Sequence, residues 1–291
     1  MLTREIMGAL ALAILWVNTL LVALAAWKQA SEKLRLHRDL RPLAPGAKGT
    51  GLFAARVDAA DEGRMIARYR LEQIGRAGAE AGGRRTIHFG DRVFRGESLG
   101  GEVIAGNMRV RIPKGEASVW VAREDVIAAA ACPDQARFDE VFEQARKARG
   151  HVREVTVAIE AGSPVWIGGE VHDEGGELSV RAAPGTGLLV SAVEPRAWLR
   201  RAAALAIVFS IVEIAIAAGV TFLVLRAPIF DGWTSRIGGA LGLGFFLAVQ
   251  PIGTAVRDAL RDPSLAFVRG RWIEPASSSR GAAVEPEARR T

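Results

Sequence analysis

The chain is poor in the residue types that build redox and metal sites. Its 291 residues include one cysteine, Cys132, and four histidines that are scattered along the sequence. A single cysteine excludes an intramolecular disulfide and any zinc site built on cysteines. Cys132 precedes a proline in an alanine-rich run, without the neighbours of an activated nucleophile. We therefore expect no metal site, no cofactor and no catalytic residue.

A phosphate-binding loop is also missing. Residues 75–78 and 96–101 are rich in glycine, but neither stretch has the spacing of a nucleotide-binding motif. We expect both stretches to be turns, and residues 75–83 to form a flexible connection. An enzyme is not expected, unless Asp and Glu residues converge in one pocket at the membrane surface.

Long hydrophobic runs are what the chain has instead. Runs near 20 apolar residues cover residues 6–27, 202–225 and 237–256, a length that crosses a bilayer as a helix. Gln250 and several glycines interrupt the third run, so whether it spans fully stays open. The sequence predicts three transmembrane helices, the first of them at residues 1–27.

The first run resembles a secretory signal peptide in its position. However, its apolar part is longer than a typical signal core, and Trp27-Lys28-Gln29 is not a small-residue cleavage site. Ala23 and Ala25 are the nearest small residues. We expect a retained anchor.

The net charge is +6, and basic residues gather beside the hydrophobic runs. One group lies in a linker at residues 28–50, a second precedes the second run, and a third follows the third run. If the chain crosses three times, all three groups lie on one side, which the positive-inside rule makes the cytoplasm. We expect a lipid bilayer partner, no nucleic acid, and a cytoplasmic soluble domain on a bacterial inner membrane. The groups are Lys28, Lys33, Arg35, Arg38, Arg41 and Lys48; Arg196, Arg200 and Arg201; and Arg257, Arg261, Arg269 and Arg271.

Four residues are predicted to mark the membrane interface: Trp27, Trp198, Arg200 and Arg201. Tryptophan is favoured at the level of the lipid headgroups, and basic residues are favoured on the cytoplasmic side.

Three polar residues lie inside the predicted spans: Asn18, Glu213 and Gln250. An ionisable group at bilayer depth costs roughly 2.5 kcal/mol or more, so Glu213 is the main functional candidate. Two interpretations stay open. Glu213 is either a neutral structural group that is hydrogen-bonded to Asn18, Gln250 or a backbone carbonyl, or a group that binds a proton or a ligand.

Small residues recur about one turn apart in the third run. Gly238 and Gly242 have the spacing that lets two helices approach closely. We expect this face to pack against the preceding helix, and oligomerisation through it stays open.

Residues 51–195 change to short alternating runs. Apolar residues at Met65, Ala67, Tyr69 and Leu71 alternate with polar ones, which is typical of a strand. A helix is predicted near residues 134–149. The chain is therefore an expected α+β membrane protein with an antiparallel β-rich domain, either a small barrel or a sandwich, and a disordered tail at residues 272–291. The predicted strands are residues 52–57, 64–71, 85–89, 102–105, 108–112, 118–122, 152–159, 165–171, 178–180 and 188–193.

One segment carries a family resemblance. Residues 153–170 read REVTVAIEAGSPVWIGGE, with a Glu-x-Gly-x-x-Val turn at Glu160, Gly162 and Val165, and residues 188–191 then lead into a hydrophobic run. The segment resembles the "beside a membrane" (BAM) domain of the GIDE family. That family is known from a mitochondrial membrane-anchored ubiquitin and SUMO ligase and from bacterial relatives.

The resemblance covers about residues 50–225, including a Tyr69-Arg70 pair. It implies an N-terminal helix, a β-rich domain and a second helix. The third hydrophobic run, residues 237–256, departs from this two-helix arrangement. The ligases end in a zinc-binding RING, whose Cys and His residues this chain lacks. Ligase activity is therefore not expected.

Taken with the hydrophobic runs, these features predict a membrane-anchored module that binds or scaffolds a protein or peptide partner. A transport or signalling component that uses Glu213 is the alternative. Partner identity and oligomeric state stay open.

Overall fold

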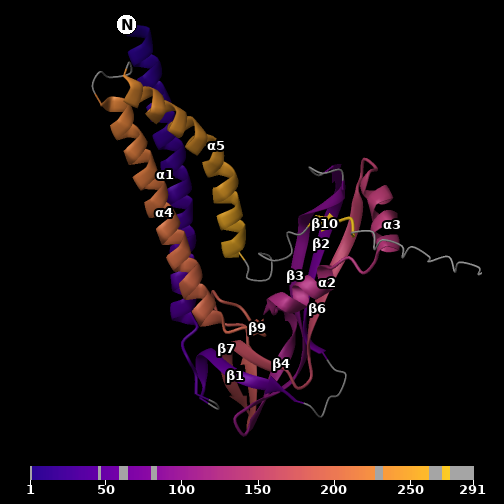
Figure 1. The fold of residues 1–291 in the computed structure, drawn as a ribbon. Coiled ribbons are helices and arrows are strands. Elements are labelled where there is room, and N and C mark those ends of the chain that lie inside the picture. The colour runs from indigo at the N-terminus through magenta and orange to yellow at the C-terminus, as the bar shows by residue number, and fades with distance from the viewer. Residues whose placement is uncertain are drawn as a thin grey trace, which may run out of the picture.

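The computed structural model describes residues 2–44, 47–58, 65–79, 84–226, 232–261 and 271–275. Within these residues the chain is α+β, as predicted, with a helical bundle and one large sheet (Figure 1). The helices are α1 (Leu2–Asp39), α2 (Arg123–Ala130), α3 (Gln135–Ala145), α4 (Pro195–Leu225) and α5 (Trp233–Arg261).

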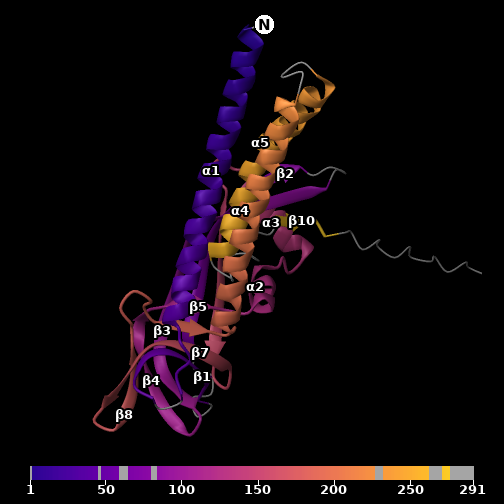
Figure 2. The same cartoon turned by 90° about the vertical axis from the view of Figure 1, so that its left-hand side faces the viewer.

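The bundle consists of α1, α4 and α5. α1 and α4 lie side by side in both views (Figures 1 and 2). Trp16 Nε1 donates to Thr221 Oγ1 at 2.9 Å, and Ser210 Oγ donates to the Ala23 carbonyl at 3.4 Å. The earlier residue of α1 contacts the later residue of α4, so the helices are antiparallel. α1 also continues as a helix to Asp39, through much of the linker predicted at residues 28–50.

By length and composition, α1 and α4 are apolar enough to cross a membrane. The apolar part of α5 is shorter and covers Trp233–Val249, so the third predicted span at residues 237–256 is matched only in part by an apolar stretch.

The strands occur close to their predicted places. A hairpin turn at Asp173 to Gly176 joins two of them, with Gly175 and Gly176 at φ values of 71° and 98°. The strands are β1 (Gly49–Val57), β2 (Met65–Ala79), β3 (Arg85–Ala105), β4 (Met108–Glu116), β5 (Ser118–Trp120), β6 (His151–Glu160), β7 (Pro164–Glu174), β8 (Glu177–Arg181), β9 (Leu189–Ser191) and β10 (Arg271–Ile273).

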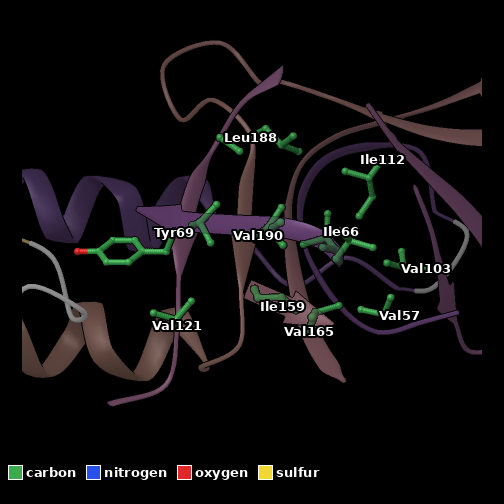
Figure 3. Close-up of a cluster of buried hydrophobic side chains, with 14 of the residues drawn as sticks. Val57, Ile66, Tyr69, Val103, Ile112, Val121, Ile159, Val165, Leu188 and Val190 are labelled. Carbon is green, nitrogen blue, oxygen red and sulfur yellow. The ribbon is translucent and has the colours of Figure 1, made fainter. Parts of the chain in front are cut away.

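The lower part of the sheet, which we call the base, closes on itself. β1 pairs with β7, β7 with β8, β8 with β4, β4 with β3, and β3 with β1 again. The prediction of a purely antiparallel domain is wrong, because β4–β8 and β5–β9 are parallel pairs. Figure 3 shows the base core, where side chains such as Val103, Ile112 and Val190 point inward from different strands and are at most 2% exposed.

The second part of the sheet, which we call the arm, consists of β2, the first half of β3, and β6. It rises beside the helices in both views (Figures 1 and 2). α3 packs on the arm through an apolar cluster. The predicted helix at residues 134–149 is confirmed over Gln135–Ala145, and its N-cap, Asp134, accepts the Arg137 N–H at 2.7 Å. The cluster contains Ile87, Phe89, Phe138, Val141, Phe142 and Ala145.

Three local predictions are wrong for a common reason. Residues 75–79 belong to β2 and residues 96–101 to β3, although both stretches were expected to be turns. Trp272 and Ile273 lie in β10, although the tail was expected to be disordered from residue 272. In each case neighbouring strands supply hydrogen bonds that a single segment does not reveal. Residues 80–83 and 276–291 lie outside the described residues.

The helices join the base through an apolar cluster that we call the junction. Leu40 at the end of α1 and Leu199 at the start of α4 are 2% and 0% exposed. They pack with Leu52, Trp120 and Leu189 of the base, and Trp120 meets Trp198 edge-on at 5.1 Å between ring centroids. The junction therefore fixes where both helices leave the sheet.

We expect Leu199→Ala to destabilise the protein by about 2–5 kcal/mol, because the substitution leaves a cavity in the junction. Leu205→Ala on the same helix is the matched control, since Leu205 is 50% exposed. Thermal unfolding in detergent measures both. Equal midpoints for the two variants would show that the junction does not stabilise the fold.

Candidate interaction site on the arm

The most elaborate set of polar and aromatic contacts among the described residues surrounds β10. This strand follows α5 in sequence but pairs with the arm, placing Trp272 opposite Ile87 and Ile273 opposite Thr86 in β3 (Figure 1). The backbone N–H of Glu274 extends the ladder, donating to the Arg85 carbonyl at 3.0 Å. A strand of three residues forms few backbone hydrogen bonds with its neighbour. Its side chains must therefore supply the rest of the docking free energy.

Glu274 is held by one arginine. Arg85 donates to its carboxylate from Nη2 at 2.5 Å, from Nε at 3.1 Å and from the backbone N–H at 3.3 Å. Arg85 Nη2 also donates to Asp139 Oδ1 at 2.6 Å, which ties the pair to α3. Hydrogen bonding to Arg85 lowers the pKa of Glu274 below its usual range. The carboxylate is therefore charged at neutral pH.

Trp272 is the apolar anchor of the strand. Its ring meets Phe89 edge-on, with 5.1 Å between the ring centroids, and packs on the apolar cluster under α3. Its indole Nε1 donates to the Ala130 carbonyl at 2.7 Å. The ring is thus buried along its apolar edge while its one polar atom is satisfied.

Arg153 lies beneath these groups and is 8% exposed. Its guanidinium sits 3.4 Å from the centroid of the Phe89 ring and 5.1 Å from that of Trp272. Nη1 donates to the Ala130 carbonyl at 2.9 Å, and Nε donates to Gln73 Oε1 at 2.8 Å. Burial lowers the pKa of Arg153 to about 10, so the side chain stays charged at neutral pH.

Ala130 ends α2, and its carbonyl is one of the groups that a helix leaves without a partner inside the helix. Arg153 and Trp272 both donate to it. A positive group at a helix C-terminus is also favoured by the helix dipole. We name the set of Arg85, Phe89, the Ala130 carbonyl and Arg153 the arm site.

The arm site was not predicted, although the sequence contains a signal for it in two polar residues on the buried side of strands. Gln73 is in phase with the inward-facing Tyr69 and Leu71 of β2, and Arg153 is in phase with the inward-facing Val155 of β6. A polar residue on the buried side of an alternating strand needs a hydrogen-bond partner.

The predicted candidates lie elsewhere, in the helical bundle. Glu213 is 2% exposed, and neither carboxylate oxygen has a hydrogen-bond partner among the described residues. The expected bond to Asn18 is therefore not made. The backbone of Gln250 belongs to α5, but its side chain lies outside the described residues, so the expected bond to Gln250 is not tested.

The four residues predicted to mark the membrane interface do not lie at one height along the helical bundle. Since Ala23 faces Ser210 and the helices are antiparallel, Trp27 lies opposite the part of α4 near Ala206, eight residues or about 12 Å from Trp198. Trp27 is 59% exposed, whereas Trp198 is half-buried in the junction, with Lys33 Nζ 5.1 Å from its ring centroid. Arg200 and Arg201 are exposed.

A groove of about 1140 Å³ opens between α1 and the sheet. Its lining includes Glu97 and Glu116, which face each other on β3 and β4. Lys33, Arg95 and Lys114 also line it, and Arg68 Nε donates to Glu97 at 2.6 Å. Because cations surround the two carboxylates, the groove has the character of a charged surface recess rather than of an acid–base site.

Among the described residues, no group of three or more His, Cys, Asp and Glu side chains could hold a metal ion. Comparisons of the chain with known protein families, with curated proteins and with solved structures find no match.

The glycines predicted for helix packing do face α4. A Cβ atom on Gly238 would lie 2.9 Å from Val224 Cγ2 and 3.1 Å from the Val224 backbone nitrogen, and one on Gly242 would lie 3.0 Å from Val220 Cγ1. The close approach of α5 to α4 therefore depends on their lack of a side chain, as in other small-residue contacts.

We expect Gly238→Ala to lower the midpoint of thermal unfolding, because the new methyl group collides with the backbone of α4. Gly239→Ala is the matched control, since nothing lies within 4 Å of a Cβ atom there. Alanine favours a helix over glycine by about 1 kcal/mol at either position, so the control should be neutral or stabilising. The same shift in both variants would refute close packing at Gly238.

Proposed function

We propose that the chain is an integral membrane protein with three spanning helices, which presents the base and the arm on one side of the bilayer as a protein-interaction module. The observation that carries this proposal is the pairing of β10 with β3. β10 follows α5, whereas β3 belongs to the domain between α1 and α4.

The number of crossings follows from that pairing. α4 leaves the junction and leads away from the base, and β10 returns to the arm (Figure 1). If α1 and α4 cross the bilayer, the chain has to cross back between residues 225 and 271. α5 runs back along α4, and its apolar part, Trp233–Val249, is about 25 Å long, near the lower limit for crossing a hydrocarbon core of about 30 Å. We therefore assign α5 as the third span.

The distribution of charge supports the orientation. Among the described residues, the basic groups that flank α1, α4 and α5 lie toward the base and arm side of the bundle, which favours a cytoplasmic location for that side under the positive-inside rule. This orientation fits a bacterial inner membrane, with the N-terminus outside.

Open strand edges support the role in protein binding. Among the described residues, β6 pairs only with β2, so its other edge has unpaired backbone groups. Val152 on this strand is 49% exposed. An exposed strand edge is a common docking place for an extended peptide. The resemblance to the BAM domain of the GIDE family agrees with a domain next to a membrane, and without RING ligands we propose no ligase activity.

A transport or signalling role is the second candidate, and the burial of Glu213 favours it. A carboxyl group without a hydrogen bond to any described residue contributes little to holding the helices together. Such a group is suited to take up a proton or a ligand.

The crossing number is testable with cysteines and a membrane-impermeant maleimide. We expect native Cys132 and a tail cysteine, Ser278→Cys in a Cys132→Ser background, to react only after permeabilisation. Gly232→Cys, between α4 and α5, should react in intact cells. Burial raises the pKa of the Cys132 thiol, so labelling is best done at about pH 8.5, where more thiolate forms.

Each alternative has its own labelling pattern. A tail cysteine on the side opposite Cys132 would contradict the third span. Reversal of all three results would keep three spans and overturn the orientation.

The interaction role is testable with a photo-crosslinking amino acid in cells. We expect discrete protein adducts from position 152 on the open edge of β6, and none from position 108 on the base. Val152 and Met108 are 49% and 43% exposed, so they are matched for access. Absence of adducts from position 152 under several growth conditions would refute the role.

Glu213→Gln in the same experiment separates the two candidate functions. A module needs no carboxylate inside the bundle and keeps its adducts. Loss of the adducts at normal protein levels would favour the second candidate.

A further inference from the structure

The segment Arg271–Glu274 lies on the arm as a peptide ligand lies on a receptor. It pairs along one strand edge, inserts one aromatic ring, and places one carboxylate on an arginine. Strand addition with side-chain pockets is a recurrent mode of peptide recognition.

We propose that the arm site is an exchangeable strand-docking site. Its resident ligand is the segment Arg271–Glu274, and an extended segment of a partner protein replaces it. This inference rests on the proposed function as an interaction module, and it names the place on the module and the chemistry of the partner.

The contacts define the partner segment. Trp272 and Glu274 point to the same side of the strand, toward the arm site, and both are partly buried. Arg271 and Ile273 alternate with them and are exposed. Because a strand turns every second side chain to one face, the arm site selects an aromatic residue followed two positions later by an acid.

The arm site is held in place without its ligand. Arg153 keeps its bond to Gln73, and Gln73 in turn donates to Asp91 Oδ1 at 2.7 Å. Arg85 keeps its bond to Asp139 and its position 5.1 Å from the ring centroid of Phe142. A receptor that needs no reorganisation binds an incoming segment with less entropic cost.

The resident segment competes because it is tethered. A short tether gives an effective concentration of about millimolar order, so a free peptide of equal chemistry binds weakly until the resident segment is disabled. Exchange also separates the end of α5 from the arm, since β10 is the strand that joins them.

Fluorescence anisotropy of a labelled peptide with the sequence of residues 269–276 tests the inference on the full chain in detergent. We expect a chain with Trp272→Ala and Glu274→Ala to bind the peptide at least about tenfold more tightly than the wild type. The matched control is Ile273→Ala, which changes an exposed position of the same strand and should bind like the wild type.

The peptide itself supplies the second comparison. Replacing its Trp by Ala, or its Glu by Gln, should abolish binding to the disabled chain, and a scrambled peptide should not bind. A single Glu274→Gln chain gives the same direction of change if the double variant unfolds. Equal binding to the disabled and wild-type chains, or binding of the scrambled peptide, would overturn the inference.

This test is independent of the crosslinking test. Crosslinked adducts without peptide binding would refute the exchangeable site and leave the interaction module in place. Peptide binding without adducts would support the site and refute docking at the open edge of β6.

Discussion

The junction is the contact on which the rest of the structure depends. Leu40 and Leu199 bring the end of α1 and the start of α4 to one place on the base, against Trp120. Because both helices leave from that place, they run together, and α5 can return only along α4. That return path puts the chain after α5 next to the arm, where β10 adds to β3. A local apolar cluster thus determines a long-range pairing.

The sequence predicted what depends on local pattern. Alternation placed most strands within a few residues, and the helix predicted near residues 134–149 contains α3. It did not predict the parallel pairing of β4 with β8, since a segment's own pattern carries no information on its neighbour. Nor did it predict β10, because three residues in a polar tail have no period of their own. The glycines at residues 96–101 led to the wrong prediction of a turn. Gly100 and Gly101 bend β3 at φ values of 78° and 151° without ending it.

Buried polar groups divide the molecule into two kinds of site. In the arm, Arg153 and Gln73 satisfy each other, and the Ala130 carbonyl accepts from Arg153. Such a network holds its members in one arrangement, which is what a binding site requires. In the bundle, no described residue hydrogen-bonds the carboxylate of Glu213. The sequence pointed to Glu213 because an acid in an apolar run is conspicuous, whereas the arm site is assembled from three separate segments, β3, the end of α2 and β6.

If α1 crosses a membrane, the arm limits how much of the bundle the hydrocarbon can cover. Both views show the arm beside the half of the bundle nearer the base (Figures 1 and 2). Its surface carries ion pairs such as Arg70–Glu154 at 2.5 Å and Arg92–Glu72 at 2.7 Å, which hydrocarbon excludes. A bilayer around the full apolar length of α1 would meet that surface. If α1 crosses a bilayer, the hydrocarbon therefore has to end where the arm begins, so the charged arm limits how deep the base end of the bundle can sit.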